Sequence, residues 1–215
     1  MIRNIIFDLA GVLLNLDIEK DTFALNSIGL PDFEGCLQRE EIYVPTLAYL
    51  NGLMPAGEYC DAIRPVCKEG VSNEKILWAM DEVLADFPKS RMQMLVELRK
   101  KYKVFLLSNL YKTAWDYTLD QFEQNGFTPE QCFDKVFLSY EMQLAKPDTR
   151  IYKEVCRESG ILPEETLYFD DSKSNVDAGN ALGMKSFLVK MNCLEEIIFD
   201  EKGNLNSLLF TSDMF

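Results

Sequence analysis

Apolar runs and amphipathic stretches alternate along most of the chain. Five short runs, rich in β-branched and aromatic residues, are typical of strands buried on both faces of a parallel sheet. They are IIF at 5–7, VFLLSN at 104–109, KVFLS at 135–139, TLYFDD at 166–171 and KSFLV at 185–189. Between the later runs lie stretches with helical periodicity at 90–102, 113–125, 148–159 and 174–182, several of which end before a glycine. The alternation predicts an α/β fold with a doubly wound parallel sheet.

The interval between the first two predicted strands is much longer than the others. Residues 8–103 separate them, which is far more than a crossover connection needs. Within this interval, apolar residues at 76, 77, 80, 83, 84 and 87 follow helical spacing after a candidate N-cap at Ser72, and Pro88 would end that helix. We therefore predict a core formed by residues 1–15 and 89–215, and an inserted helical cap formed by residues 16–88.

Composition and charge narrow the range of partners. With 22 Lys and Arg against 35 Asp and Glu, the formal net charge is -13, so most of the surface would repel a nucleic acid. The chain has no histidine and its six cysteines form no C-x-x-C pair, so a zinc site is not expected and the thiols are expected to be reduced. The first residues are too weakly apolar for a signal segment, and no apolar stretch reaches about 18 residues. We expect a cytoplasmic protein without a nucleic-acid or membrane partner, present as a monomer or a weak homodimer.

Polar residues follow the apolar runs at the points where the strands should end. Asp8 follows the first run, Ser108 and Asn109 end the second, and Asp170 and Asp171 end the fourth. Open α/β sheets bind ligands at this edge. A lysine, at position 146 in the loop QLAKPD, precedes a predicted helix and could reach the same crevice. These segments are therefore predicted to form one site.

The predicted site needs a cation. Two unit charges 4 Å apart repel by about 4 kcal/mol at an effective dielectric of 20, so Asp8, Asp170 and Asp171 cannot gather unpaired. Ligands that are all oxygen favour a hard ion, and Mg²⁺ is the expected one. Lys146 would add positive charge and Ser108 a neutral donor. Such a site suits a phosphoryl group, whose transfer depends on positioning and charge neutralisation.

Four segments in this order resemble the motifs of the haloacid dehalogenase superfamily. They are FDLAGVLL, LLSN, LAKPDTRIY and YFDDSKSNVDAGNALG, and the long interval after the first resembles the subclass with a helical cap. Within it, FLSYEMQLAKPDTRIY and YFDDSKSNVDAGNALGMKSFLVK are similar to the bacterial alpha-D-glucose-1-phosphate phosphatase group. The resemblance covers residues 2–14 and about 90–190. It implies a Rossmann-like sheet of strand order 5-4-1-2-3.

The resemblance also implies a role for each site residue. Asp8 would attack phosphorus to form an aspartyl-phosphate. The phosphoryl oxygens would be held by Ser108, Asn109 and Lys146. The metal would be bound by Asp8, Asp171 and the backbone carbonyl of Ala10, with Asp170 as a further ligand or as the group that orients the metal's water. Asn175 would support Lys146.

Ala10 departs from the pattern of most phosphatases that this chain resembles. An aspartate at that position protonates the leaving oxygen and later activates water, which is typically worth 10² to 10⁴ in rate. Two explanations are open. An anomeric phosphate, as in a hexose 1-phosphate, has a better leaving group and needs less protonation. Alternatively Asp17, Glu40 or Glu41 could deliver the proton through water.

The sequence favours a Mg²⁺-dependent phosphatase of a small phosphorylated metabolite, with a hexose 1-phosphate as the first candidate. A 2-haloacid dehalogenase would also use an aspartate nucleophile, but it would need neither a metal nor the acidic pair at 170–171. A phosphosugar-binding pseudophosphatase without turnover is a second alternative. Cap aromatic residues could face a sugar or pack among the cap helices, and both interpretations stay open for Phe23, Tyr43, Tyr49 and Tyr59.

Overall fold

The centre of the fold is a five-stranded parallel sheet. The computed structural model describes residues 1–210. The strands are β1 (Asn4–Phe7), β2 (Lys103–Ser108), β3 (Lys135–Leu138), β4 (Thr166–Asp170) and β5 (Lys185–Leu188). Their order is β3-β2-β1-β4-β5, with every pair parallel, which confirms the predicted order counted from the opposite edge. β1 is central because its apolar residues pair with β2 on one side and β4 on the other.

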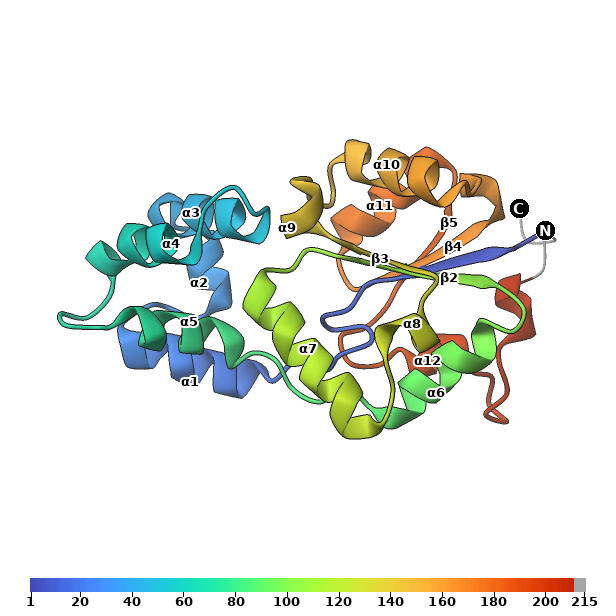
Figure 1. The fold of residues 1–215 in the computed structure, drawn as a ribbon, viewed down its shortest axis with the longest axis horizontal. Coiled ribbons are helices and arrows are strands. Elements are labelled where there is room, and N and C mark those ends of the chain that lie inside the picture. Colours follow the sequence, from blue (N-terminus) through green and yellow to red (C-terminus); the bar gives the residue numbers. More distant parts are fainter. Residues whose placement is uncertain (211–215) are drawn as a thin grey trace.

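Helices cover both faces of this sheet (Figure 1). One face carries α6 (Lys89–Leu98), α7 (Lys112–Asn125), α8 (Pro129–Cys132) and α12 (Glu195–Ile198). The other carries α10 (Thr149–Ser159) and α11 (Lys173–Leu182), while α9 (Ser139–Met142) directly follows β3. Successive side chains of a strand point to opposite faces, so Ile5 and Phe7 belong to one hydrophobic cluster and Ile6 to another. The doubly wound α/β architecture is confirmed.

The long interval between β1 and β2 is helical. It contains α1 (Ile18–Ile28), α2 (Phe33–Leu37), α3 (Glu40–Leu50), α4 (Ala56–Ile63), the 3₁₀ helix η1 (Arg64–Val66) and α5 (Asn73–Asp81). Figure 1 shows these helices gathered beyond the carboxyl ends of the strands. Helices were expected here, whereas the domain boundaries at 15/16 and 88/89 stay a prediction.

The predicted helix after Ser72 is shorter than its apolar spacing indicates. Ser72 is the N-cap, since its side chain accepts a hydrogen bond from the Lys75 amide. The helix ends at Asp81 instead of continuing to residue 87. The Asp17 amide donates to the Val83 carbonyl at 2.8 Å, and the Ala85 amide donates to the Asn15 carbonyl at 2.9 Å. The segment that leaves the core and the segment that returns to it therefore pair in an antiparallel arrangement. This pairing uses backbone groups of residues 83–85 that would form hydrogen bonds within a longer helix.

The C-terminal part of the described chain packs back on the core, as expected for the segment GNLNSLLF. It contains the 3₁₀ helix η3 (Ser207–Phe210), and the Phe210 ring stacks on Tyr102 with centroids 4.9 Å apart. A second 3₁₀ helix, η2 (Pro163–Glu165), leads into β4. Within residues 1–210, no helix has the length and apolar character that crossing a bilayer requires. All six cysteines are free thiols.

Candidate active site

Three carboxylates meet at the carboxyl ends of β1 and β4. Asp8 directly follows β1, Asp170 ends β4, and Asp171 comes next in the chain. Each offers one oxygen such that the three oxygens lie within 4.8 Å of one another. Because β1 and β4 are parallel neighbours, their ends deliver these side chains to one point. The spacing satisfies the condition for Asp8 and Asp171 to share a ligand.

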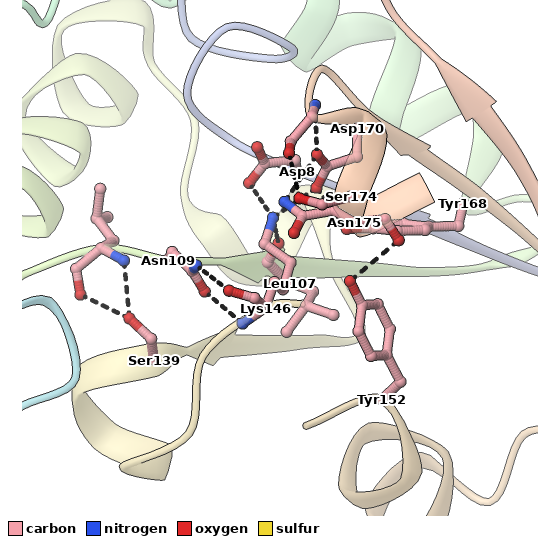
Figure 2. Close-up of polar contacts among 12 residues, drawn as sticks. Asp8, Leu107, Asn109, Ser139, Lys146, Tyr152, Tyr168, Asp170, Ser174 and Asn175 are labelled. Carbon is pink, nitrogen blue, oxygen red and sulfur yellow. Dashed lines mark hydrogen bonds and ion pairs between the residues drawn. The ribbon is translucent and has the colours of Figure 1, made fainter. Parts of the chain in front are cut away.

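Lys146 is the cation that the chain itself supplies to this cluster (Figure 2). Its Nζ lies 2.8 Å from Asp8 Oδ1 and 2.7 Å from Asp170 Oδ2, and it donates to the Leu107 carbonyl at 3.0 Å. The side chain is almost completely buried. Burial alone would lower the pKa of Lys146, but the two carboxylates outweigh it and raise that pKa above its ordinary value. The ammonium therefore stays charged in the interior.

Asp170 is occupied by donors on both of its oxygens. Its Oδ1 accepts from the Ser172 amide at 2.8 Å and from Asn175 Nδ2 at 3.0 Å. Its Oδ2 accepts from Lys146 and from the Tyr168 hydroxyl. Burial opposes the charge, yet Lys146, the Tyr168 hydroxyl and the Ser172 amide hold the pKa of Asp170 below its usual range. A carboxylate has about four lone-pair sites, and these four hydrogen bonds occupy that number, while the assignment of Asp170 as a metal ligand stays a prediction.

Asn175 contacts Asp170, the carboxylate that pairs with Lys146. Its side-chain amide donates to Asp170, and the Tyr152 hydroxyl donates to its backbone carbonyl at 3.2 Å (Figure 2). Asn175 thus reaches Lys146 only through the Asp170 carboxylate. The physical reason is position, since Asn175 lies in the first turn of α11, next to the strand end that carries Asp170.

Asp8 and Asp171 are the two carboxylates whose charges are not fully compensated. Burial, with a further contribution from the other carboxylates, raises the pKa of Asp8 to about 7 and that of Asp171 to about 6. Three carboxylates against one ammonium leave two negative charges when all groups are ionised. A divalent cation would neutralise this remainder.

The loop after β1 lies directly against Asp171. Gly11 has φ +79°, and a Cβ placed there would lie 2.3 Å from Asp171 Oδ2. Only glycine allows this approach without displacing the carboxylate. Next to it, the Ala10 carbonyl oxygen accepts no hydrogen bond from the described residues. That oxygen, Asp8 and Asp171 form an all-oxygen donor set of the kind that Mg²⁺ prefers.

Ser108 and Asn109, at the end of β2, have different environments. Ser108 is 1% exposed, and its Oγ has no hydrogen-bond partner within residues 1–210. A buried hydroxyl without a partner is costly, which points to a ligand that would satisfy it. Asn109 instead holds the backbone of Lys146, accepting from its amide and donating to its carbonyl, both at 2.9 Å.

Two of the three acids considered as replacements for the missing aspartate at position 10 have other partners. Asp17 caps α1 by accepting from the Lys20 amide at 3.0 Å, and this hydrogen bond lowers its pKa. Glu41 pairs with Arg39 at 3.0 Å. Glu40 lies in the first turn of α3. Within residues 1–210, no hydrogen bond or ion pair joins any of the three to Asp8, and delivery of a proton through water stays a prediction.

The cap aromatic residues fall into two groups. Tyr49 and Tyr59 are buried and stack with ring centroids 4.7 Å apart, so packing accounts for them. Phe23 and Tyr43 are 72% and 41% exposed.

Arg91 is a structural residue near the site that the sequence pattern did not reveal. It is 3% exposed and makes a bidentate pair with Glu195 at 2.7 and 2.8 Å. Its guanidinium also donates to the carbonyls of Leu13 and Asn192, which ties the loop after Asp8 to the chain after β5. A lone arginine at the start of an amphipathic helix ordinarily indicates a solvated face, so no sequence signal identified it.

The chain is similar to known proteins in sequence. The model of the family described as haloacid dehalogenase-like hydrolase matches residues 2–183. A D-ribitol-5-phosphate phosphatase of Bacteroides thetaiotaomicron is 28% identical over 188 residues, which are 87% of this chain and 91% of that protein. A phosphorylated carbohydrates phosphatase of Thermotoga maritima is 28% identical over 184 residues, covering 84% of this chain and 82% of that protein.

A solved structure is similar over nearly its whole length. It is a haloacid dehalogenase family enzyme of B. thetaiotaomicron in complex with magnesium and inorganic phosphate. The identity is 34%, the coverage 89% of this chain and 96% of that chain, and the TM-score 0.78.

Proposed function

The chain belongs to the haloacid dehalogenase-like hydrolases, and on that premise we propose that it is a Mg²⁺-dependent phosphatase of a small phosphorylated carbohydrate or polyol. The observation that carries the proposal is the cluster of three carboxylates and one buried lysine, which lacks two positive charges. The magnesium and phosphate in the similar structure, and the phosphatase names of the relatives, support the same conclusion.

The donor atoms fit a magnesium ion. We assign Asp8, Asp171 and the Ala10 carbonyl as its protein ligands, because these oxygens are not saturated by donors of the chain. We assign Asp170 to holding Lys146, since its own oxygens are already occupied. When bound, Mg²⁺ would neutralise the charge of the phosphoryl group and of the nucleophile.

The residues of the chain then have defined tasks. A carboxylate oxygen of Asp8 attacks phosphorus, so that an O–P bond forms while the bond to the leaving oxygen breaks, and this oxygen departs as an alcohol with a proton taken from water. Lys146 and the unpartnered hydroxyl of Ser108 hold phosphoryl oxygens. Asn109 fixes the backbone of Lys146. Water then attacks phosphorus, which releases inorganic phosphate and restores the Asp8 carboxylate.

Ala10 bears on the identity of the substrate. Alanine replaces the usual donor at position 10, so the chain offers no acid there to protonate the leaving oxygen directly, and delivery through water by Asp17, Glu40 or Glu41 stays the alternative. A hexose 1-phosphate, whose anomeric oxygen leaves more easily, is the substrate that this chemistry favours. The relative named for ribitol 5-phosphate makes a polyol phosphate the alternative within the same class.

The proposal is tested by phosphate release from a panel of sugar and polyol phosphates, with Mg²⁺ and with a chelator. Wild type should release phosphate only with Mg²⁺, and Asp8→Asn should be inactive. Asp177→Asn is the matched control, since Asp177 is an exposed carboxylate that pairs with Lys173 on α11. Substrate binding without turnover in wild type would instead support a pseudophosphatase, and equal turnover by Asp8→Asn would contradict the mechanism.

We also expect the enzyme to act in the cytoplasm as a monomer or a weak homodimer. The six free thiols support a reducing compartment. Sedimentation equilibrium would test the oligomeric state, and a tight dimer would contradict the second expectation.

A further inference from the structure

The segment 108–113, here called the phosphate loop, connects the site to the cap. It begins at the unpartnered hydroxyl of Ser108 and continues with Asn109, which holds Lys146. Its later residues bind the end of cap helix α5, because the Tyr111 hydroxyl donates to the Met80 carbonyl at 2.7 Å and Thr113 bonds Asp81 at 3.0 Å. One short segment therefore contacts both the reacting groups and the cap.

Ser139 joins the same loop to a second cap helix. It is fully buried, and its Oγ accepts from the Leu110 amide at 2.9 Å. The same Oγ lies 2.5 Å from the Leu50 carbonyl, in the last turn of α3, and 3.2 Å from the Leu110 carbonyl. The dashed lines from Ser139 in Figure 2 mark its contacts with the Leu110 backbone. A hydroxyl has one proton, so it can donate to the cap or to the loop, but not to both at once.

The contact around Ser139 is close enough to depend on cap position. Gly52, just after α3, has φ +65°, and a Cβ there would lie 2.2 Å from the carbonyl oxygen of Tyr140. Beside it, Tyr49 of the cap stacks on Tyr111 of the phosphate loop with ring centroids 5.1 Å apart. A cap that moved away would lose the Leu50 acceptor, and the Ser139 proton would then turn to the Leu110 carbonyl.

We propose that Ser139 is a positioning residue that couples docking of the cap to the placement of Ser108. With the cap docked, Ser139 donates to Leu50 and leaves the Leu110 carbonyl free. With the cap lifted, it donates to Leu110 and holds the loop differently. This inference rests on the proposed phosphatase function, and it adds a residue outside the four motifs.

Kinetics of a double-mutant cycle test the coupling. The variants are Ser139→Ala, Tyr111→Phe, which removes one loop–cap hydrogen bond, and the double variant, with p-nitrophenyl phosphate and ribitol 5-phosphate as substrates. Ser139→Ala should lower kcat by about tenfold or more, since a displacement of about 1 Å at a reacting group can cost 10²-fold. If the two changes acted independently, the fold reductions in kcat/KM of the single variants would multiply in the double variant. We expect the reduction in the double variant to be at least about threefold smaller than that product, because both changes weaken the same docking of the cap.

The control is Ser27→Ala, which removes a hydroxyl that donates to the Ala24 carbonyl at 2.7 Å within α1 and touches neither the loop nor the site. Its kcat and KM should match wild type. A Ser139→Ala enzyme whose kcat and KM stay within about twofold of wild type, or losses that multiply, would overturn the coupling. Wild type without Mg²⁺-dependent turnover would refute the proposed function instead.

Amide hydrogen exchange covers the case in which Ser139→Ala does not fold. In wild type with Mg²⁺, adding inorganic phosphate should slow exchange in residues 48–53 and 108–113 together. In Tyr111→Phe, the phosphate-dependent slowing of residues 48–53 should be weaker. An unchanged response of residues 48–53 in that variant would also overturn the coupling.

Discussion

Replacing Lys146 with methionine tests whether this buried ammonium holds the site together. Lys146→Met keeps the aliphatic volume but leaves Asp8 and Asp170 without their shared cation. Each N–O pair, at 2.8 and 2.7 Å, is worth about 6 kcal/mol of Coulomb energy at an effective dielectric of 20, before the cost of desolvation. Removing one partner from a buried pair typically costs about 3–5 kcal/mol. We expect a loss of this size in the free energy of unfolding.

The matched control is Lys112→Met. Lys112 lies 2.7 Å from Asp116, as close as the buried pairs, but its side chain is 68% exposed. Exposed pairs contribute about 0.2–1 kcal/mol, so this variant should lose no more than that. The substitution is the same in both variants, so the contrast compares a buried lysine that pairs with two carboxylates with an exposed lysine that pairs with one.

Urea unfolding at pH 7.5 with a chelator measures the loss of unfolding free energy in Lys146→Met and in Lys112→Met. For a chain of this length, a loss of about 3–5 kcal/mol corresponds to roughly 6–20 °C in Tm. The loss in Lys146→Met should shrink at pH 5, because unpaired buried carboxylates take up protons. Equal losses of unfolding free energy in the two variants, each below about 1 kcal/mol, would contradict this prediction.

Three further predictions concern the loop after β1 and the acids beside it. Gly11→Ala puts a Cβ 2.3 Å from Asp171 Oδ2 at φ +79°, so calorimetry should show Mg²⁺ affinity at least about tenfold weaker; wild-type affinity would contradict this. Ala10→Asp should speed turnover of alkyl phosphates relative to hexose 1-phosphates, and an unchanged substrate profile would count against a missing general acid. Burial raises the pKa of Asp171 to about 6, whereas the pKa of an aspartate in an unfolded chain is about 3.9. In the metal-free protein, the stability that the Asp171 side chain contributes is therefore present below about pH 4 and is lost as the pH rises through 6. Between about pH 4 and pH 6, the free energy of unfolding of wild type should therefore fall relative to that of Asp171→Asn. A rise of wild type relative to the variant would contradict the direction of this pKa shift.

The strands and the residues at their ends could be predicted from the sequence because both depend on local pattern. A run such as TLYFDD carries its own burial signal and ends in charge, and β4 spans Thr166–Asp170 accordingly. Helix ends depended on more than pattern. The helix after Ser72 stops at Asp81, because the returning chain pairs with residues 15–17, which no periodicity within the helix could show.

The partners of polar side chains were harder to predict than their places. Asp170 and Asp171 have the same side chain, yet Asp170 accepts four hydrogen bonds, whereas Asp171 lies partly buried against Gly11. That difference follows from the alternation of side chains at a strand end and from donors on distant elements. Ser139, an ordinary residue in sequence, contacts Leu50 across 89 positions, and only the folded chain shows this.

Calorimetric titration of Mg²⁺ into the metal-free protein tests the central claim, that Asp8 and Asp171 share a divalent cation. We predict a single binding event in wild type and in the surface variant Asp177→Asn, and an affinity at least about tenfold weaker in Asp8→Asn and in Asp171→Asn. Equal Mg²⁺ affinity in all four proteins would contradict the account.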